Sequence, residues 1–243
     1  MQKIRFHRSA LAIAGLLALY FVVSIRVYYT QSLFLHHWLV WNVFLAMLPP
    51  LFAWVFMHCR IKGLRLMLAA LWFLFLPNAP YLVTDLIHLA HLSFDHWGEG
   101  RALYPWLTLM QTGISMFLAT TMGLWSLSVM HRAMGRWRGP VAGWVMTVLV
   151  CMASGYAVFL GRFLRFNSWD VLQPLHLLGR AVRYTDDFGL LFSLSFGAYI
   201  LFTYCIYRAF GALHAAMPKG ASSQKNPALP NTDRDNPPRQ YTA

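Results

Sequence analysis

The chain alternates between long uncharged, mostly apolar runs and short polar connections. Runs of about 17–25 apolar residues span a bilayer as helices, because a helix rises about 1.5 Å per residue across about 30 Å of hydrocarbon. Lipid offers no hydrogen-bond partner to open backbone groups, so these runs are expected to be helical. The pattern predicts an all-α, polytopic membrane helical bundle with about six transmembrane helices, near residues 9–29, 36–58, 64–80, 102–130, 140–162 and 188–210.

Three segments depart from the simple pattern of spans. Pro77 and Pro80 remove backbone donors inside the third run, so we expect a break there and a new helix from about Tyr81. Residues 162–187 mix apolar and polar positions, which predicts an extra interfacial helix. Residues 217–243 are polar and proline-rich and predict a disordered cytoplasmic tail, leaving residues 1–216 as the multi-pass membrane domain.

One packing cue stands out in the fifth run. Ala153, Ala157 and Gly161 recur every four residues and so share one helix face. A stripe of small residues lets a neighbouring membrane helix approach closely. This face is therefore expected to contact another span.

Basic residues set the expected orientation of the spans. The formal net charge is +12, although only 12% of the 243 residues are charged. Lysine and arginine concentrate near the N-terminus and then in every second connection between predicted spans, around residues 3–8, 60–65, 132–138 and 208–225. The positive-inside rule then places both termini in the cytoplasm. Topology thus explains the basic charge without nucleic acid, and membrane lipids are the partners it indicates, while protein partners stay unknown.

The first run also has the basic start of a signal peptide, at Lys3, Arg5 and Arg8. Its apolar core is long, and Tyr28–Tyr29 is a poor small-residue cleavage site. These features favour a first transmembrane helix that stays in the protein.

Scarce carboxylates and imidazoles gather just after the proline break. Asp85, His88, His91 and Asp95 are spaced by three, three and four residues, so they share one face of a helix. Carboxylate and imidazole groups bind divalent metals and perform acid–base chemistry. Asp85 and His88 are therefore the catalytic candidates, and Asp85, His88 and His91 are the candidate ligands of a divalent metal, the one cofactor considered. A solvated polar face of an amphipathic helix at the membrane surface explains the same spacing.

A second polar cluster, GRFLRFNSWD, occupies residues 161–170. Arg162 and Arg165 are three residues apart and are expected to share a helix face, where paired guanidinium groups suit phosphate or carboxylate. Snorkelling to lipid headgroups is the alternative role for both. Asn167 suits the N-cap of a following helix, and Asp170 suits its first turn.

The two stretches FLPNAPYLVTDLIHL and GRFLRFNSWD together resemble domain-of-unknown-function family 1361, a family of bacterial integral membrane proteins. The resemblance covers most of residues 10–212. It implies a multi-pass protein of the bacterial inner (cytoplasmic) membrane and no established activity. It favours Asn78, Asp85, Arg162, Asn167 and Asp170, which stand in the matching motifs.

Two functional hypotheses follow and stay open at the level of sequence, as does the question of whether the protein is an enzyme. In the first, an outward-facing Asp/His/Arg cluster binds or processes an anionic lipid or envelope precursor. Its binding residues would be Asn78, Arg162, Arg165, Asn167 and Asp170. In the second, the protein is a non-catalytic transporter or membrane scaffold whose polar clusters are structural, for example through a pair between Asp85 and Arg162.

Overall fold

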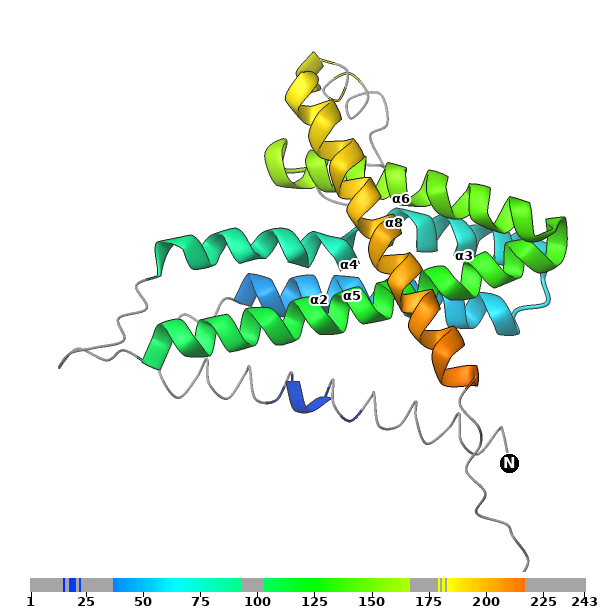
Figure 1. The fold of residues 1–243 in the computed structure, drawn as a ribbon, viewed down its shortest axis with the longest axis horizontal. Coiled ribbons are helices and arrows are strands. Elements are labelled where there is room, and N and C mark those ends of the chain that lie inside the picture. The colour runs from blue at the N-terminus through cyan, green and yellow to red at the C-terminus, as the bar shows by residue number, and fades with distance from the viewer. Residues whose placement is uncertain are drawn as a thin grey trace, which may run out of the picture. The chain divides into compact units, whose positions relative to one another are not determined.

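The computed structural model describes residues 15, 18–20, 22, 37–92, 103–166, 179, 181 and 183–216. Within these residues every regular element is a helix (Figure 1). The elements are α2 (His37–His58), α3 (Lys62–Phe75), α4 (Asn78–Tyr81), the 3₁₀ helix η1 (Leu82–His91), α5 (Leu103–Arg138), α6 (Pro140–Phe163) and α8 (Asp187–Ala216). The all-α prediction is confirmed.

The helices of the described part have the length and composition of membrane spans. Five segments are long and apolar enough to cross a bilayer: Leu39–His58, Lys62–Ala90, Pro105–Arg138, Pro140–Phe163 and Asp187–Ala216. They correspond to the second to sixth predicted spans. The first predicted span, most of the predicted interfacial helix and the predicted tail from residue 217 lie outside the described residues.

The fourth predicted span ends too early. The helix that contains it, α5, continues past residue 130 to Arg138. Arginine is a good helix former, and Arg136 and Arg138 stand in the last turn, where positive charge offsets the helix dipole. The apolar run thus predicts the apolar part of the helix, and the helix itself is longer.

The chain forms two compact units, Met1–Arg208 and Ala209–Ala243. In the first unit α5 is the central helix, because it packs against α2, α4, η1 and α6. α2 in turn packs against α3 and α4. Residues distant in the sequence therefore meet around α5.

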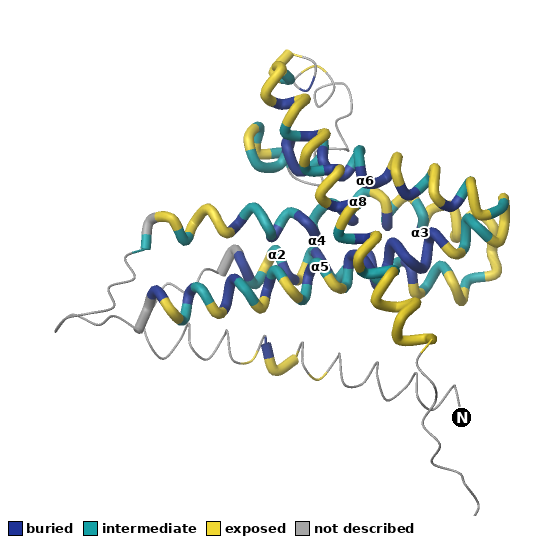
Figure 2. The backbone as a smooth tube through the Cα atoms, viewed as in Figure 1, coloured by how far each residue is buried: buried dark blue, intermediate teal, exposed yellow. Residues whose placement is uncertain are grey.

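Much of α5 is buried (Figure 2), and its buried residues include several hydroxyl side chains. Ser115, Ser126 and Ser128 are buried, and each hydroxyl donates to a backbone carbonyl three or four residues earlier, at 2.6–2.8 Å. Met110 and Ile114, one turn apart, are more than half exposed. A hydroxyl that donates within its own helix is satisfied when buried, and the Ser126 hydroxyl also accepts from the indole N–H of Trp72 on α3 at 3.2 Å.

α6 and α8 touch through their backbones at Gly155. A Cβ atom built on Gly155 would lie 2.3 Å from the carbonyl oxygen of Ser193 and 2.5 Å from the nitrogen of Gly197. This contact is not on the predicted stripe of Ala153, Ala157 and Gly161. A Cβ on Gly161 would instead lie 3.4 Å from the ring of Tyr81.

Candidate functional site

The third span is interrupted at the proline break and continues as α4 and η1. Pro80 has no N–H for the carbonyl of Leu76, which accepts instead from the N–H of Ala79 at 3.1 Å. The carbonyl of Phe75 thereby loses its helical donor, and the side-chain amide of Asn78 donates to it at 2.9 Å. Asn78, a predicted binding residue, thus bonds to the backbone of the break itself. The backbone stays helical across it, with Leu76, Pro77 and Leu82 all in the right-handed region.

The helix that follows the break is a 3₁₀ helix rather than the expected α-helix. With three residues per turn, residues 82, 85, 88 and 91 stand in one line. Leu82 and Asp85 are buried, with exposed fractions of 0% and 1%, but His88 is exposed. Asp85 therefore lies inside the bundle, whereas His88, one turn further along the same side of η1, lies at its surface.

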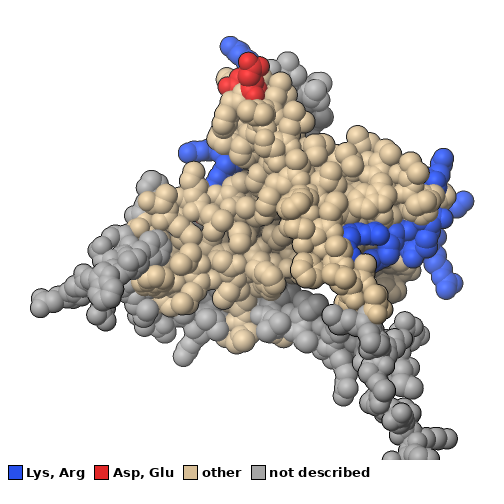
Figure 3. Space-filling view, viewed as in Figure 1, with Lys and Arg blue, Asp and Glu red and all other residues tan. Residues whose placement is uncertain are grey.

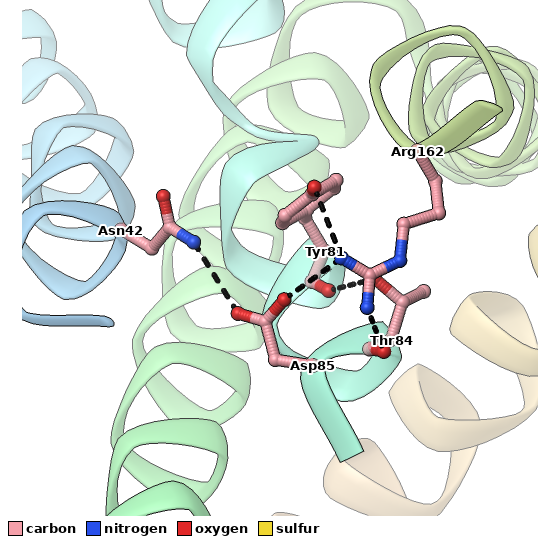
Figure 4. A network of polar contacts seen from close by, with 5 residues as sticks. All are labelled: Asn42, Tyr81, Thr84, Asp85 and Arg162. Carbon is pink, nitrogen blue, oxygen red and sulfur yellow. Dashed lines mark hydrogen bonds and ion pairs between the residues drawn. The ribbon is translucent and has the colours of Figure 1, made fainter. Parts of the chain in front are cut away.

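Asp85 forms an ion pair with Arg162 on α6, with 3.2 Å between Oδ1 and Nη1. Its other oxygen, Oδ2, accepts from the amide of Asn42 on α2 at 3.3 Å. Arg162 also donates to the hydroxyl of Tyr81 at 3.3 Å and to the backbone carbonyl of Thr84. Figure 4 shows these five residues, which come from α2, from the α4–η1 segment and from α6. We call Asn42, Tyr81, Thr84, Asp85 and Arg162 the latch.

The latch balances its charges inside the protein. Arg162 is 17% exposed, against 1% for Asp85, so the pair is largely removed from solvent. The guanidinium also lies 5.5 Å from the centre of the Tyr81 ring. Arg162 stands in the last turn of α6, where the helix dipole favours a cation. A buried charge without a partner is costly, so each of these contacts stabilises the pair.

Arg165 does not share a helix face with Arg162, which corrects the sequence prediction. α6 ends at Phe163, and Arg165 follows in the left-handed conformation with φ 56°. The N–H of Phe166 bonds back to the carbonyl of Leu160 at 3.2 Å, as at helix ends that close with a left-handed residue. The turn leaves Arg165 exposed. Asn167 and Asp170, the remaining predicted binding residues, lie outside the described residues.

The geometry gives no support to the metal hypothesis. Among the residues that the structure describes, no three His, Cys, Asp or Glu side chains are grouped so that they could hold a metal ion. Of the three candidate ligands, Asp85 is occupied by Asn42 and Arg162, His88 is exposed, and His91 is the last residue of η1.

Sequence reasoning missed Asn42, Tyr81 and Thr84 as members of the cluster. Asn42 carried a usable signal, since a polar side chain in an apolar span usually faces the protein interior. Tyr81 and Thr84 contribute a ring, a hydroxyl and a backbone carbonyl, which no residue pattern marks out.

Fold and site together define a helical membrane protein with a buried ion pair between spans. The chain belongs to the family described as "Protein of unknown function (DUF1361)", whose model matches residues 41–203. The match contains all five latch residues. No curated protein and no solved structure matches the chain.

Proposed function

We propose that the protein is a non-catalytic membrane scaffold in which the latch fixes the discontinuous third span to α2 and α6. One observation carries this proposal: both oxygens of Asp85 already have protein partners, and the residue is only 1% exposed. A general base must lie within hydrogen-bonding reach of its substrate, and burial closes Asp85 to a substrate from solvent. The contacts of Asp85 instead match a structural ion pair.

The hypothesis of anionic lipid binding or processing requires Arg162 to exchange its partners. Arg162 donates hydrogen bonds to Asp85, Tyr81 and Thr84, within one compact cluster. Arg165, the second guanidinium of that hypothesis, is exposed beyond the end of α6. The arrangement favours a structural cluster over an anion site at this position.

The cavity in the bundle interior also favours a scaffold over a transporter. It has a volume of about 20 Å³ and is lined by residues that include Pro80, Thr120 and Ser154. A cavity of this size holds about one water molecule. Transporter sites lie deep between the helices and must accommodate their solute.

A double-mutant cycle tests the proposal. Asp85→Asn leaves Arg162 without its anion, and Arg162→Gln leaves a buried carboxylate without its cation. Each change is expected to cost about 3–5 kcal/mol of stability, the usual effect of removing one member of a buried pair. In the double variant both charges are gone, so its loss should be smaller than the sum by about 1–3 kcal/mol.

Arg165→Gln is the matched control, because it removes one exposed arginine near the same end of α6. Its melting temperature in detergent should equal that of the wild-type protein. The proposal fails if Asp85→Asn and Arg162→Gln also melt like the wild type. That result would favour a binding or catalytic cluster, whose charged groups seldom contribute to stability.

A further inference from the structure

A second polar region lies away from the latch, at the end of the first unit where α2 meets α3 and α5 meets α6. Its basic residues are exposed and come from the α2–α3 connection, the start of α3 and the end of α5: Arg60, Lys62, Arg65, Arg132, Arg136 and Arg138. We call these six residues the basic end. Figure 3 shows lysine and arginine gathered there. The sequence contains no Asp or Glu before residue 85 or between residues 100 and 169, so α2, α3, α5 and α6 bring no carboxylate to this end.

A pocket of about 230 Å³ opens between α2 and α5 at the basic end. From α5 its wall includes Trp125, Val129, Arg132 and Arg136, which are spaced by four, three and four residues and so share one helix face. From α2 it includes Trp54 and His58. The pocket thus pairs two arginines with an aromatic wall.

The aromatic wall is held in place by its own contacts. Nδ1 of His58 lies 2.8 Å from the backbone carbonyl of Trp54, which can only accept, so the ring nitrogen donates. The ring centres of Trp54 and His58 lie 4.7 Å apart. Arg136 contacts α2 as well, with Nη2 3.8 Å from the sulfur of Met57. A thioether is a weak acceptor, so this contact leaves the guanidinium available to a stronger one.

We propose that this pocket binds the phosphate group of an anionic phospholipid. Two guanidinium groups one turn apart present forked N–H donors that match phosphate oxygens. Basic pockets between membrane helices bind lipid headgroups in this way. No carboxylate of the described residues forms an ion pair with Arg132 or Arg136, so an anion need not displace an internal partner.

The surroundings of the pocket indicate a lipid rather than free phosphate. A volume of about 230 Å³ accommodates a headgroup and not a whole lipid. Beside it on α2, Leu51, Trp54 and Met57 are 51%, 45% and 44% exposed, although they are apolar. Acyl chains can lie along these side chains while the phosphate enters the pocket. Tryptophan is enriched where membrane proteins meet the lipid headgroups, because its ring is amphipathic.

The test uses the full chain purified in dodecyl maltoside, with phosphatidylglycerol added as the probe. A ligand that binds only the folded protein raises its melting temperature, and the titration yields a Kd. The variant Arg132→Gln/Arg136→Gln is expected to bind about 30-fold more weakly, at about fivefold for each arginine. Without lipid it should melt like the wild type, because both side chains are exposed.

The matched control is Arg60→Gln/Lys62→Gln, which removes the same charge from the basic end at two residues that do not line the pocket. It should keep its affinity for phosphatidylglycerol. A third variant, Arg132→Lys/Arg136→Lys, keeps the charge but loses the forked donors, and its affinity should lie between those of the wild type and the glutamine variant. It keeps the test decisive if the glutamine variant fails to fold.

Three results would overturn the proposal. Equal weakening by the control pair would mean that the lipid responds to diffuse surface charge. Equal stabilisation by phosphatidylcholine would mean that the anionic headgroup is not recognised. Stabilisation of the same size by inorganic phosphate would identify free phosphate, and not a lipid, as the occupant.

Discussion

Gly155→Ala tests the contact between α6 and α8 most directly. The added Cβ would lie 2.3 Å from the carbonyl oxygen of Ser193 and 2.5 Å and 2.9 Å from the nitrogen and Cα of Gly197. All three atoms belong to the backbone of α8, so no side-chain rotation relieves the overlap. The two helices must therefore move apart along their contact.

The expected cost of Gly155→Ala combines two opposing terms. Overpacking a close contact costs about 1–3 kcal/mol. Alanine in a helix interior recovers about 1 kcal/mol through its helix propensity. Because the overlap is with backbone, we expect the first term to win and the variant to lose about 1–2 kcal/mol. For a chain of this size that is a fall in melting temperature of about 2–8 °C.

Gly113→Ala on α5 is the control, since a Cβ there meets no atom within 4 Å. It changes helix propensity alone and should raise the melting temperature slightly. Both variants are measured by thermal unfolding in the same detergent. If Gly155→Ala melted at or above the wild-type temperature, the close backbone approach of α6 and α8 would be refuted.

The membrane makes the fold of this chain readable from sequence. Backbone groups in lipid must bond internally, so each long apolar run must be a helix, and five runs are. The rotation of each helix about its axis is less constrained. The small-residue stripe on α6 pointed to Ala153, Ala157 and Gly161, whereas the backbone of α6 meets that of α8 at Gly155. Several faces of one span contain small residues, and the partner's surface decides which is used.

The part of the candidate site that could be predicted is the part formed by charged residues, because such residues are rare in the apolar spans. A pair between Asp85 and Arg162 was the example given for the structural alternative, and the two side chains do pair, since a charge between spans needs a partner. Arg165 was placed wrongly because its left-handed turn depends on where α6 ends, and helix ends are not fixed by three-residue spacing. The spacing grouped His88 with Asp85, and the two do share one side of η1, but His88 is exposed where Asp85 is buried.

Three further changes probe interior hydrogen bonds. Ser154→Ala should leave the melting temperature unchanged or raise it, because the Ser154 hydroxyl is buried without a partner among the described residues. Trp72→Phe should cost about 1 kcal/mol, since it removes a buried hydrogen bond of 3.2 Å to a serine of α5. Asn42→Leu keeps the size of the side chain but removes the donor to Asp85 Oδ2, which is 3.3 Å away. An unsatisfied buried acceptor costs about 1–3 kcal/mol, and the length of this bond favours the lower end. In the Asp85→Asn/Arg162→Gln background the buried charge is absent, so Asn42→Leu should cost much less. The test compares thermal melts of the wild type and the Asp85→Asn/Arg162→Gln variant, each with and without Asn42→Leu. An equal loss of stability in both backgrounds would show that Asn42 contributes packing and does not stabilise the latch.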